Sequence, residues 1–199
     1  GKGFKSGGFF GGITFSDAEL EPFDPEELIA YEIGFRAELA DGKVRVDGAA
    51  FYYDYRDIQT FIQVSVGGLS VLRLDNVDSA EILGFDFDVA WRAARGLTLQ
   101  AGLGYVDTEL GAFDSATGPV PAGNKLPNAP ELTLNGLAEF EWALASEHLL
   151  RLVVDASYTD SVFKEAVNFG YLAADAYWLS NARLVWAPSD LHWELAAWV

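Results

Sequence analysis

The sequence predicts an all-β protein: an antiparallel up-and-down meander that forms part of a large transmembrane β-barrel. Apolar and polar residues alternate over long stretches, and a period of two is that of a strand with one apolar and one polar face. The stretches reach about ten residues, the length that a tilted strand needs to cross a bilayer. Aromatic residues near the stretch ends suggest interfacial girdles. They are Trp91, Tyr105, Trp142, Tyr158, Trp178, Trp186 and Trp193.

The alternation locates the strands in order along the chain. Residues 43–62 predict one strand, although residues 49–53 are apolar or aromatic on both faces. The cleaner stretches, each of which predicts a strand, cover residues 28–40, 85–92, 97–105, 132–142 and 150–158. With shorter stretches toward both chain ends, we count nine strands. The apolar set expected to face lipid includes Leu99, Leu103, Leu134 and Phe140, and the inward set includes Gln100, Asn135 and Glu139.

The connections between these strands are of two kinds. Turn-forming residues predict tight turns at 41–42, 94–96, 146–148 and 188–190. Longer polar or glycine-rich connections are expected at about 8–27, 63–72, 110–130 and 161–173. Short and long connections alternate, so the meander should place all tight turns at one end and all long loops at the other. Nine strands do not close a barrel of even strand number, and the chain is therefore expected to be an arc of a larger one.

Composition excludes several function classes. Thirteen basic and thirty acidic residues give a net charge of -17, which argues against binding to nucleic acid. The chain has no Cys and only His148 and His192, so no zinc, haem or other metal site is expected. No apolar run approaches eighteen residues, the length of a transmembrane helix. A soluble, carbohydrate-binding β-sandwich remains an alternative, although its strands average about 5–6 residues.

Several strings resemble segments of TonB-dependent outer-membrane receptors. Residues 3–9 read GFKSGGF and residues 30–36 read AYEIGFR; residues 126–130 read LPNAP. Further similar segments are 47–59, the set Asn76, Ala80 and Gly84–Asp86, residues 181–184, and residues 193–195. The resemblance covers essentially all 199 residues in family order.

This resemblance implies a twenty-two-stranded barrel in the outer membrane of a Gram-negative bacterium. A plug domain inside that barrel, absent from residues 1–199 as is the terminal strand, would contact the TonB complex. The implied function is uptake of a ferric siderophore or similar bulky nutrient, with outer-membrane lipid as a further partner. A passive porin-like channel or an adhesin barrel is the alternative from another class.

Candidate binding residues lie mainly in the long loops, since binding concentrates on loops held by a rigid scaffold. The acidic run Asp17, Glu19, Glu21, Asp24, Glu26 and Glu27 lacks calcium-loop spacing and is expected to be a solvated external loop. No cofactor is expected. No catalytic residue is expected either, because the carboxylate pairs 86/88 and 139/141 lack a matched acid–base set. Ligand-contact candidates are Phe9, Phe10, Phe113, Phe163, Phe169, Tyr171, Arg36 and Arg183.

The isolated chain should not behave as a soluble monomer. An arc leaves open hydrogen-bonding ladders on both outer strands, and its lipid face would be bare apolar surface in water. We expect residues 1–199, expressed alone, to aggregate in buffer and to form no transport-competent pore. Size-exclusion chromatography with and without detergent, followed by a conductance assay, measures both. A monodisperse monomer without detergent would overturn the membrane assignment and favour the sandwich.

Overall fold

The computed structural model describes residues 1–12, 21–144, 147–190 and 192–199. Its main element is one antiparallel sheet of nine strands in the order β1-β4-β5-β6-β7-β10-β11-β14-β15. The bounds are β1 Lys2–Lys5, β4 Glu26–Leu39, β5 Val44–Val66, β6 Leu69–Ala94, β7 Leu97–Leu110, β10 Leu132–Leu144, β11 His148–Thr159, β14 Tyr177–Pro188 and β15 Leu195–Trp198. Three two-stranded pairs lie in the connections: β2 Gly8–Phe9 with β3 Pro22–Phe23, β8 Phe113–Ser115 with β9 Gly118–Val120, and β12 Val162–Phe163 with β13 Ala173–Ala174.

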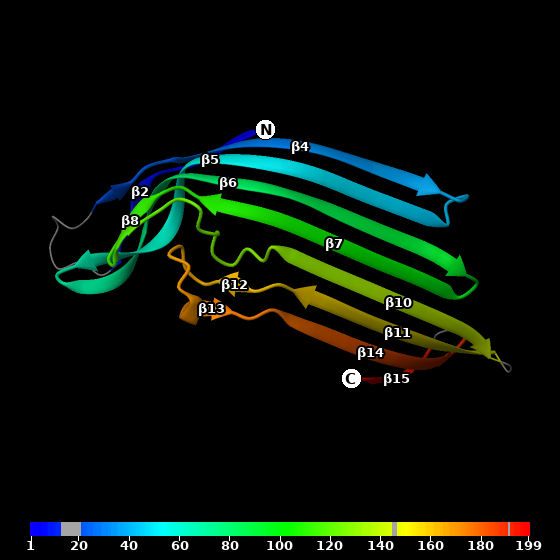
Figure 1. Cartoon of the computed structure of the whole chain (residues 1–199). Helices are drawn as coiled ribbons and strands as arrows, with labels where there is room; N and C mark the ends of the chain where they lie inside the picture. The colour runs from blue at the N-terminus through cyan, green and yellow to red at the C-terminus, as the bar shows by residue number, and fades with distance from the viewer. Residues whose placement is uncertain (13–20, 145–146, 191) are drawn as a thin grey trace.

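The predicted meander is confirmed. Each strand of the sheet pairs with its neighbours in chain order, and Figure 1 shows the turn after β4 and the connection after β7 at opposite ends of the sheet. Asp41 and Gly42, with φ of 56° and 77°, supply the left-handed backbone that a tight turn needs. Residues 13–20 and Ser146, which belong to two of the expected connections, lie outside the described residues.

Strand register divides the side chains between two faces. Phe35, Gly48, Phe87, Leu103, Leu134 and Tyr158 form one continuous row across six strands. We call this the apolar face. Asp88, Gly102, Asn135 and Ser157 form a row on the opposite, polar face. The expected opposition of Leu99, Leu103, Leu134 and Phe140 to Gln100, Asn135 and Glu139 follows from the same register.

Two aromatic belts border the apolar face. Near the long-loop end, rings pair across neighbouring strands: Tyr31 with Tyr52 at 6.4 Å, Phe85 with Tyr105 at 5.6 Å, and Tyr158 with Trp178 at 5.1 Å between ring centroids. Near the short-turn end, the Trp186 ring meets the Trp193 ring edge-on at 5.5 Å. Trp178 and Trp186 are eight residues apart on β14, about 27 Å of strand, which suits an apolar band about 25 Å tall.

The expected loop at 63–72 is wrong. Residues 58–66 and 69–77 continue β5 and β6 as a long hairpin, closed by Gly67 and Gly68 with φ of 56° and 81°. Positive φ at both central residues gives the two-residue turn whose twist matches paired strands. The antiparallel pairs run without a break from Ile58–Val77 to Val66–Leu69, next to the Gly-Gly turn.

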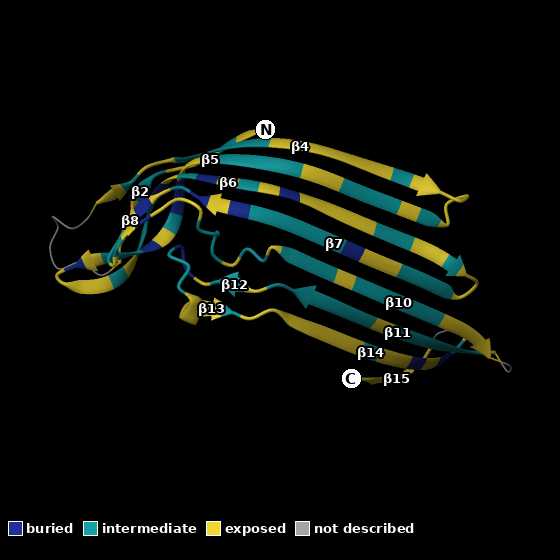
Figure 2. Cartoon of the chain, in the orientation of Figure 1, coloured by how far each residue is buried: buried dark blue, intermediate teal, exposed yellow. Residues whose placement is uncertain are grey.

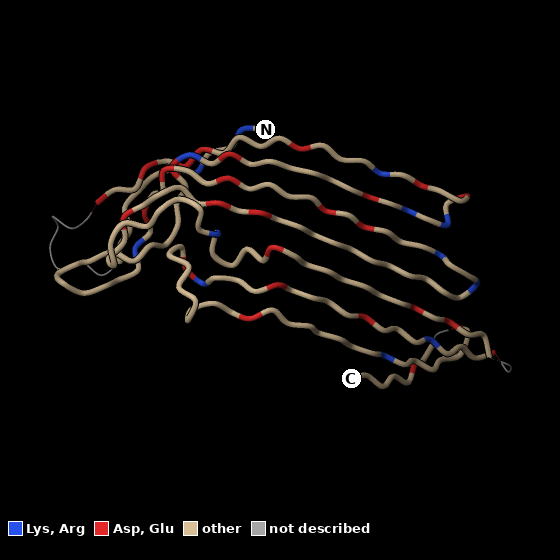
Figure 3. Tube along the Cα trace, in the orientation of Figure 1, with Lys and Arg blue, Asp and Glu red and all other residues tan. Residues whose placement is uncertain are grey.

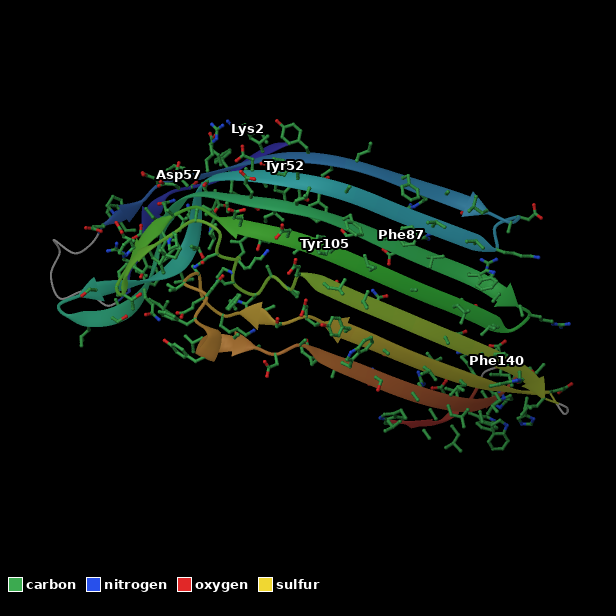
Figure 4. The ribbon with its side chains drawn as sticks, viewed as in Figure 1. Lys2, Tyr52, Asp57, Phe87, Tyr105 and Phe140 are labelled. Atoms are coloured by element: carbon green, nitrogen blue, oxygen red, sulfur yellow. The ribbon has the colours of Figure 1, made fainter. Side chains whose placement is uncertain are left out.

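This outer hairpin bends away from the sheet at Asp57. Asp57 has a φ of 51° and stands unpaired between the pairs Arg56–Ser79 and Ile58–Val77. Asp57 is labelled in Figure 4 at the place where β5, still paired with β6, bends away from the rest of the sheet. A non-glycine residue in the left-handed region is uncommon, and here it redirects the chain without a change of register.

The outer hairpin packs on other loops to form what we call the cap: residues 58–77, 113–120 and 164–168. Figure 2 shows buried residues gathered at this end of the sheet. Their core consists of Ile58, Ile62, Val77, Ala80, Leu110, Phe113, Val120 and Ala166. Ala80 and Leu110 belong to the polar-face series of β6 and β7, so the cap covers the long-loop end of the polar face. That face is therefore the interior of the barrel wall.

The only regular helical element in the described part of the chain is a 3-10 turn at Gly170–Leu172. The described residues contain no helix that is long and apolar enough to cross a membrane.

An arginine on the apolar face should destabilise the barrel. In the protein encoded by the whole gene, refolded into lipid vesicles, Leu134→Arg should lower the free energy of unfolding by about 2–4 kcal/mol, because the charge enters hydrocarbon. Asn135→Arg, one residue along on the polar face, is the matched control and should change it little. Denaturant titration measures both values. An equal loss of unfolding free energy in the two variants would contradict the assignment of the apolar and polar faces.

Candidate functional site

The cap is held to the sheet by a cluster of hydrogen bonds around Asn76. Its Nδ2 donates to the carbonyl oxygens of Asp57 at 2.6 Å and Asp24 at 3.1 Å, and its Oδ1 accepts from the Asp24 backbone N–H at 2.6 Å. One amide side chain thus satisfies backbone groups at the bend and in the segment before β4. Because such groups are costly to leave unpaired, Asn76 fixes the angle of the outer hairpin.

Gln59, the cross-strand partner of Asn76 in the outer hairpin, completes this attachment. It is buried, its backbone N–H donates to Glu26 Oε2 at 2.7 Å, and its Nε2 donates to the carbonyl oxygens of Ser6 at 3.0 Å and Asp24 at 3.1 Å. The first long connection and the outer hairpin are therefore tied together at several points rather than lying free of each other.

Residues of the cap line two cavities that are open to solvent. The larger, of about 600 Å³, lies between the outer hairpin and the β8–β9 hairpin. Arg73 lines it and forms ion pairs with Asp75 at 2.5 Å and Glu21 at 3.0 Å. Partial burial of Arg73 works against its charge, but the hydrogen bond and charge of Asp75, with Glu21, outweigh it and raise the pKa of Arg73. The guanidinium is a fixed positive charge beside apolar Ile62, Phe113 and Val120.

The second cavity, of about 440 Å³, lies between the outer hairpin and the loops that follow β9 and β12. Phe61 and Leu72 contribute apolar wall, and Lys164 and Glu165 contribute opposite charges. Both cavities have the size of ligand pockets, about 300–1,000 Å³, with apolar walls and a few polar groups.

Below the cap, the polar face is a charged wall. Charged residues of both signs occur along its strands (Figure 3). Arg36 and Arg45 both pair with Asp47, Arg151 pairs with Glu141 at 3.3 Å, and Arg183 pairs with Glu194 at 2.7 Å. Such pairing is typical of a wet lumen rather than of a dry core, since exposed ion pairs contribute little to stability.

Two glycines of β7 leave room for polar side chains of the neighbouring strands in the middle of this wall. A Cβ at Gly102 would lie 2.5 Å from Asn135 Nδ2 and 2.6 Å from Asp88 Oδ1, side chains from the strands on either side. A Cβ at Gly104 would lie 2.7 Å from Thr133 Oγ1. Polar side chains of β6 and β10 lean over the backbone of β7 at these glycines, and a side chain there would have to displace them.

The structure distributes the expected ligand-contact residues over several places. Phe10 meets Phe61 of the outer hairpin edge-on at 5.6 Å, Phe169 stacks on Tyr171 at 5.3 Å, and Phe9 is exposed on β2. Phe113 is buried in the cap core and Phe163 lies on β12. Arg36 and Arg183 lie on the polar face of β4 and β14, far apart along the sheet order. Ligand contact by these eight residues stays a prediction.

Of the expected acidic loop, Asp17 and Glu19 lie outside the described residues, whereas Glu21 pairs with Arg73. Across the described ranges, no group of three or more His, Cys, Asp or Glu side chains is arranged to hold a metal ion.

Sequence reasoning missed the residues that build the cavities. The Gly67-Gly68 pair between alternating stretches is a hairpin signal that would have revealed the outer hairpin, and with it Gln63 and Arg73. Glu165 gave no signal, because it is one acidic residue in a loop.

The sheet has long strands, one apolar and one polar face, aromatic belts, and loops that cover one end. These features define a segment of an outer-membrane β-barrel wall. The family model described as "TonB dependent receptor-like, beta-barrel" matches residues 1–199. The chain belongs to this family of TonB-dependent receptors, which lie in the outer membrane of Gram-negative bacteria.

Known relatives agree with this placement. The pesticin receptor of Yersinia enterocolitica is 26% identical over 163 residues, which are 80% of this chain and 23% of the receptor. The metal-pseudopaline receptor CntO of Pseudomonas aeruginosa is 27% identical over 127 residues, 63% of this chain and 17% of CntO. The chain spans about a quarter or less of the length of these relatives.

The fold also matches solved structures. The ferric yersiniabactin uptake receptor FyuA from Yersinia pestis superposes with a TM-score of 0.72 at 20% identity, over 95% of this chain and 27% of FyuA. BauA, the ferric preacinetobactin receptor from Acinetobacter baumannii, gives a TM-score of 0.65 at 17% identity, over 94% of this chain and 26% of BauA. At such identities the likeness shows the fold.

Removal of the Asn76 side chain should loosen the cap. Asn76→Ala deletes three hydrogen bonds, each with a net value of about 0.5–1.5 kcal/mol, and strands backbone groups of Asp24 and Asp57. In the protein encoded by the whole gene, hydrogen exchange should speed up in residues 57–77 and 21–26 while β10 and β11 stay protected. Asn181→Ala, which removes one exposed bond to Asp155, is the control. Unchanged exchange in the outer hairpin would show that Asn76 does not hold it.

Proposed function

We propose that the protein containing this chain takes up a ferric siderophore or a similar bulky metal chelate across the outer membrane, using TonB-coupled energy. The observation that carries this proposal is the cap, with its two cavities, above the charged polar face of a TonB-dependent receptor barrel. In that protein, residues 1–199 supply part of the barrel wall. The plug domain of the family would lie against the polar face and contact the TonB complex.

The relatives support the ligand class. FyuA is a ferric yersiniabactin uptake receptor, BauA is a ferric preacinetobactin receptor, and CntO is a metal-pseudopaline receptor. Both cavities combine apolar wall with fixed charge, Arg73 in one and Lys164 with Glu165 in the other. A chelate that carries both aromatic or aliphatic surface and polar groups complements such walls.

In this proposal the protein binds and passes a ligand and is not an enzyme. Its relatives are receptors and transporters. Membership of a TonB-dependent family disfavours both a passive porin-like channel and a soluble carbohydrate-binding sandwich.

Iron uptake tests the proposed function. The whole gene would be expressed in a Gram-negative strain that lacks its own siderophore receptors, and uptake of ⁵⁵Fe would be measured for a panel of ferric siderophores. At least one chelate should restore uptake in the strain with TonB and not in a matched strain without TonB. Uptake that is independent of TonB would favour a passive channel. No uptake of any metal chelate from a folded, surface-exposed protein would contradict the ligand class.

A further inference from the structure

The smaller cap cavity is lined by a buried carboxylate, one oxygen of which lacks a hydrogen-bond donor. Glu165 is only 8% exposed, and Gln63 Nε2 donates to its Oε2 at 2.8 Å. Its other oxygen, Oε1, is closed off from solvent and has no partner among the described residues. Buried polar groups are normally hydrogen-bonded, and a buried carboxylate with a free oxygen is costly. The site therefore favours an added donor.

A donor that enters the cavity can reach this oxygen. Glu165 already lines the cavity, and the terminal torsion of a Glu side chain is soft. A rotation of the carboxylate would turn Oε1 toward a bound group without movement of the backbone, and it would lengthen the hydrogen bond from Gln63 to Oε2.

Lys164 places a positive charge on the same cavity. Its Nζ donates to Asn128 Oδ1 at 3.0 Å, which uses one of three ammonium donors. Within the described part of the chain, no ion pair joins Lys164 to Glu165 although they are adjacent in sequence. Two opposite charges thus line one cavity while each keeps unused bonding capacity.

The wall that carries these charges is fixed in advance. Asn168, at a φ of 59°, accepts from the Lys125 backbone N–H at 2.6 Å and donates to the carbonyl oxygens of Lys125 and Glu165 at 2.9 and 3.0 Å. Asn124 Nδ2 donates to the Ala166 carbonyl oxygen at 2.8 Å. A prebuilt site loses little ordering entropy on binding.

We propose that this cavity binds a dipolar group of the amino-acid type, with a protonated amine toward Glu165 and a carboxylate toward Lys164. Phe61 and Leu72 line the same cavity and would contact the carbon chain between the two charges. A bare metal ion fits less well, because it would find one free carboxylate oxygen and the repulsion of an ammonium. The claim that this cavity binds such a group stands by itself. The claim that the bound group is part of a transported ligand rests on the proposed function.

Binding of three probes of equal length tests the site: 4-aminobutanoate, butan-1-amine and butanoate. With the protein encoded by the whole gene in detergent, ligand-observed NMR titration should show 4-aminobutanoate binding at least about tenfold more tightly than either singly charged probe, since it gains a second charge-assisted contact. Glu165→Gln should weaken 4-aminobutanoate about tenfold. Glu109→Gln, an exposed carboxylate on β7 away from the cavity, is the matched control and should not.

The outcomes separate the possibilities. Equal affinity for all three probes, no binding, or unchanged binding by Glu165→Gln would overturn the inference. If that variant does not fold, as judged by protease resistance, the ranking of probes on the unaltered protein decides alone. Failed probe binding with intact ⁵⁵Fe uptake would overturn this inference only, and the converse result would overturn the proposed function only.

Discussion

The constraint on which this structure depends is that a strand in hydrocarbon must satisfy every backbone N–H and C=O through its neighbours. The nine strands meet it with continuous antiparallel ladders, in which each strand pairs with the next along the chain. Once the ladders fix the register, side chains alternate strictly between faces. The same alternation that gives lipid an unbroken row from Phe35 to Tyr158 leaves the opposite row free for Asp88, Asn135 and their neighbours.

Beyond the aromatic belt this constraint relaxes, and the chain uses the freedom to build a compact cap. Water can satisfy backbone groups there, so a residue such as Asp57 can leave the ladder and bend the hairpin. The cap then gains its own small core around Val77 and Leu110, both almost fully buried. Polar side chains hold its position, because Asn76 and Gln59 bond to backbone groups of the first long connection.

The parts that could be predicted from sequence are those governed by a repeating rule. Period two identified the strands and their faces, and turn residues such as Asp41-Gly42 identified the short connections. The outer hairpin was missed because glycines and polar residues at 63–72 resemble a loop when read without their pairing partner. The cavity around Glu165 could not be predicted, since it depends on segments 102 residues apart that meet only after folding. Family resemblance gave the function class, and the folded cap gave the places where a ligand can bind.

The cap also has a mechanical consequence. Adjacent strands of a barrel wall are joined by one ladder, so the wall bends easily about axes parallel to its strands. The Gln63–Glu165 hydrogen bond joins the β5–β6 hairpin to the connection after β11, passing over β7 and β10, which lie between them in the sheet. This hydrogen bond connects two parts of the rim that are not neighbours in the sheet. The mouth of the barrel is therefore held along this arc by a contact that does not run through the strand ladders, and a group bound at Glu165 would act on that contact.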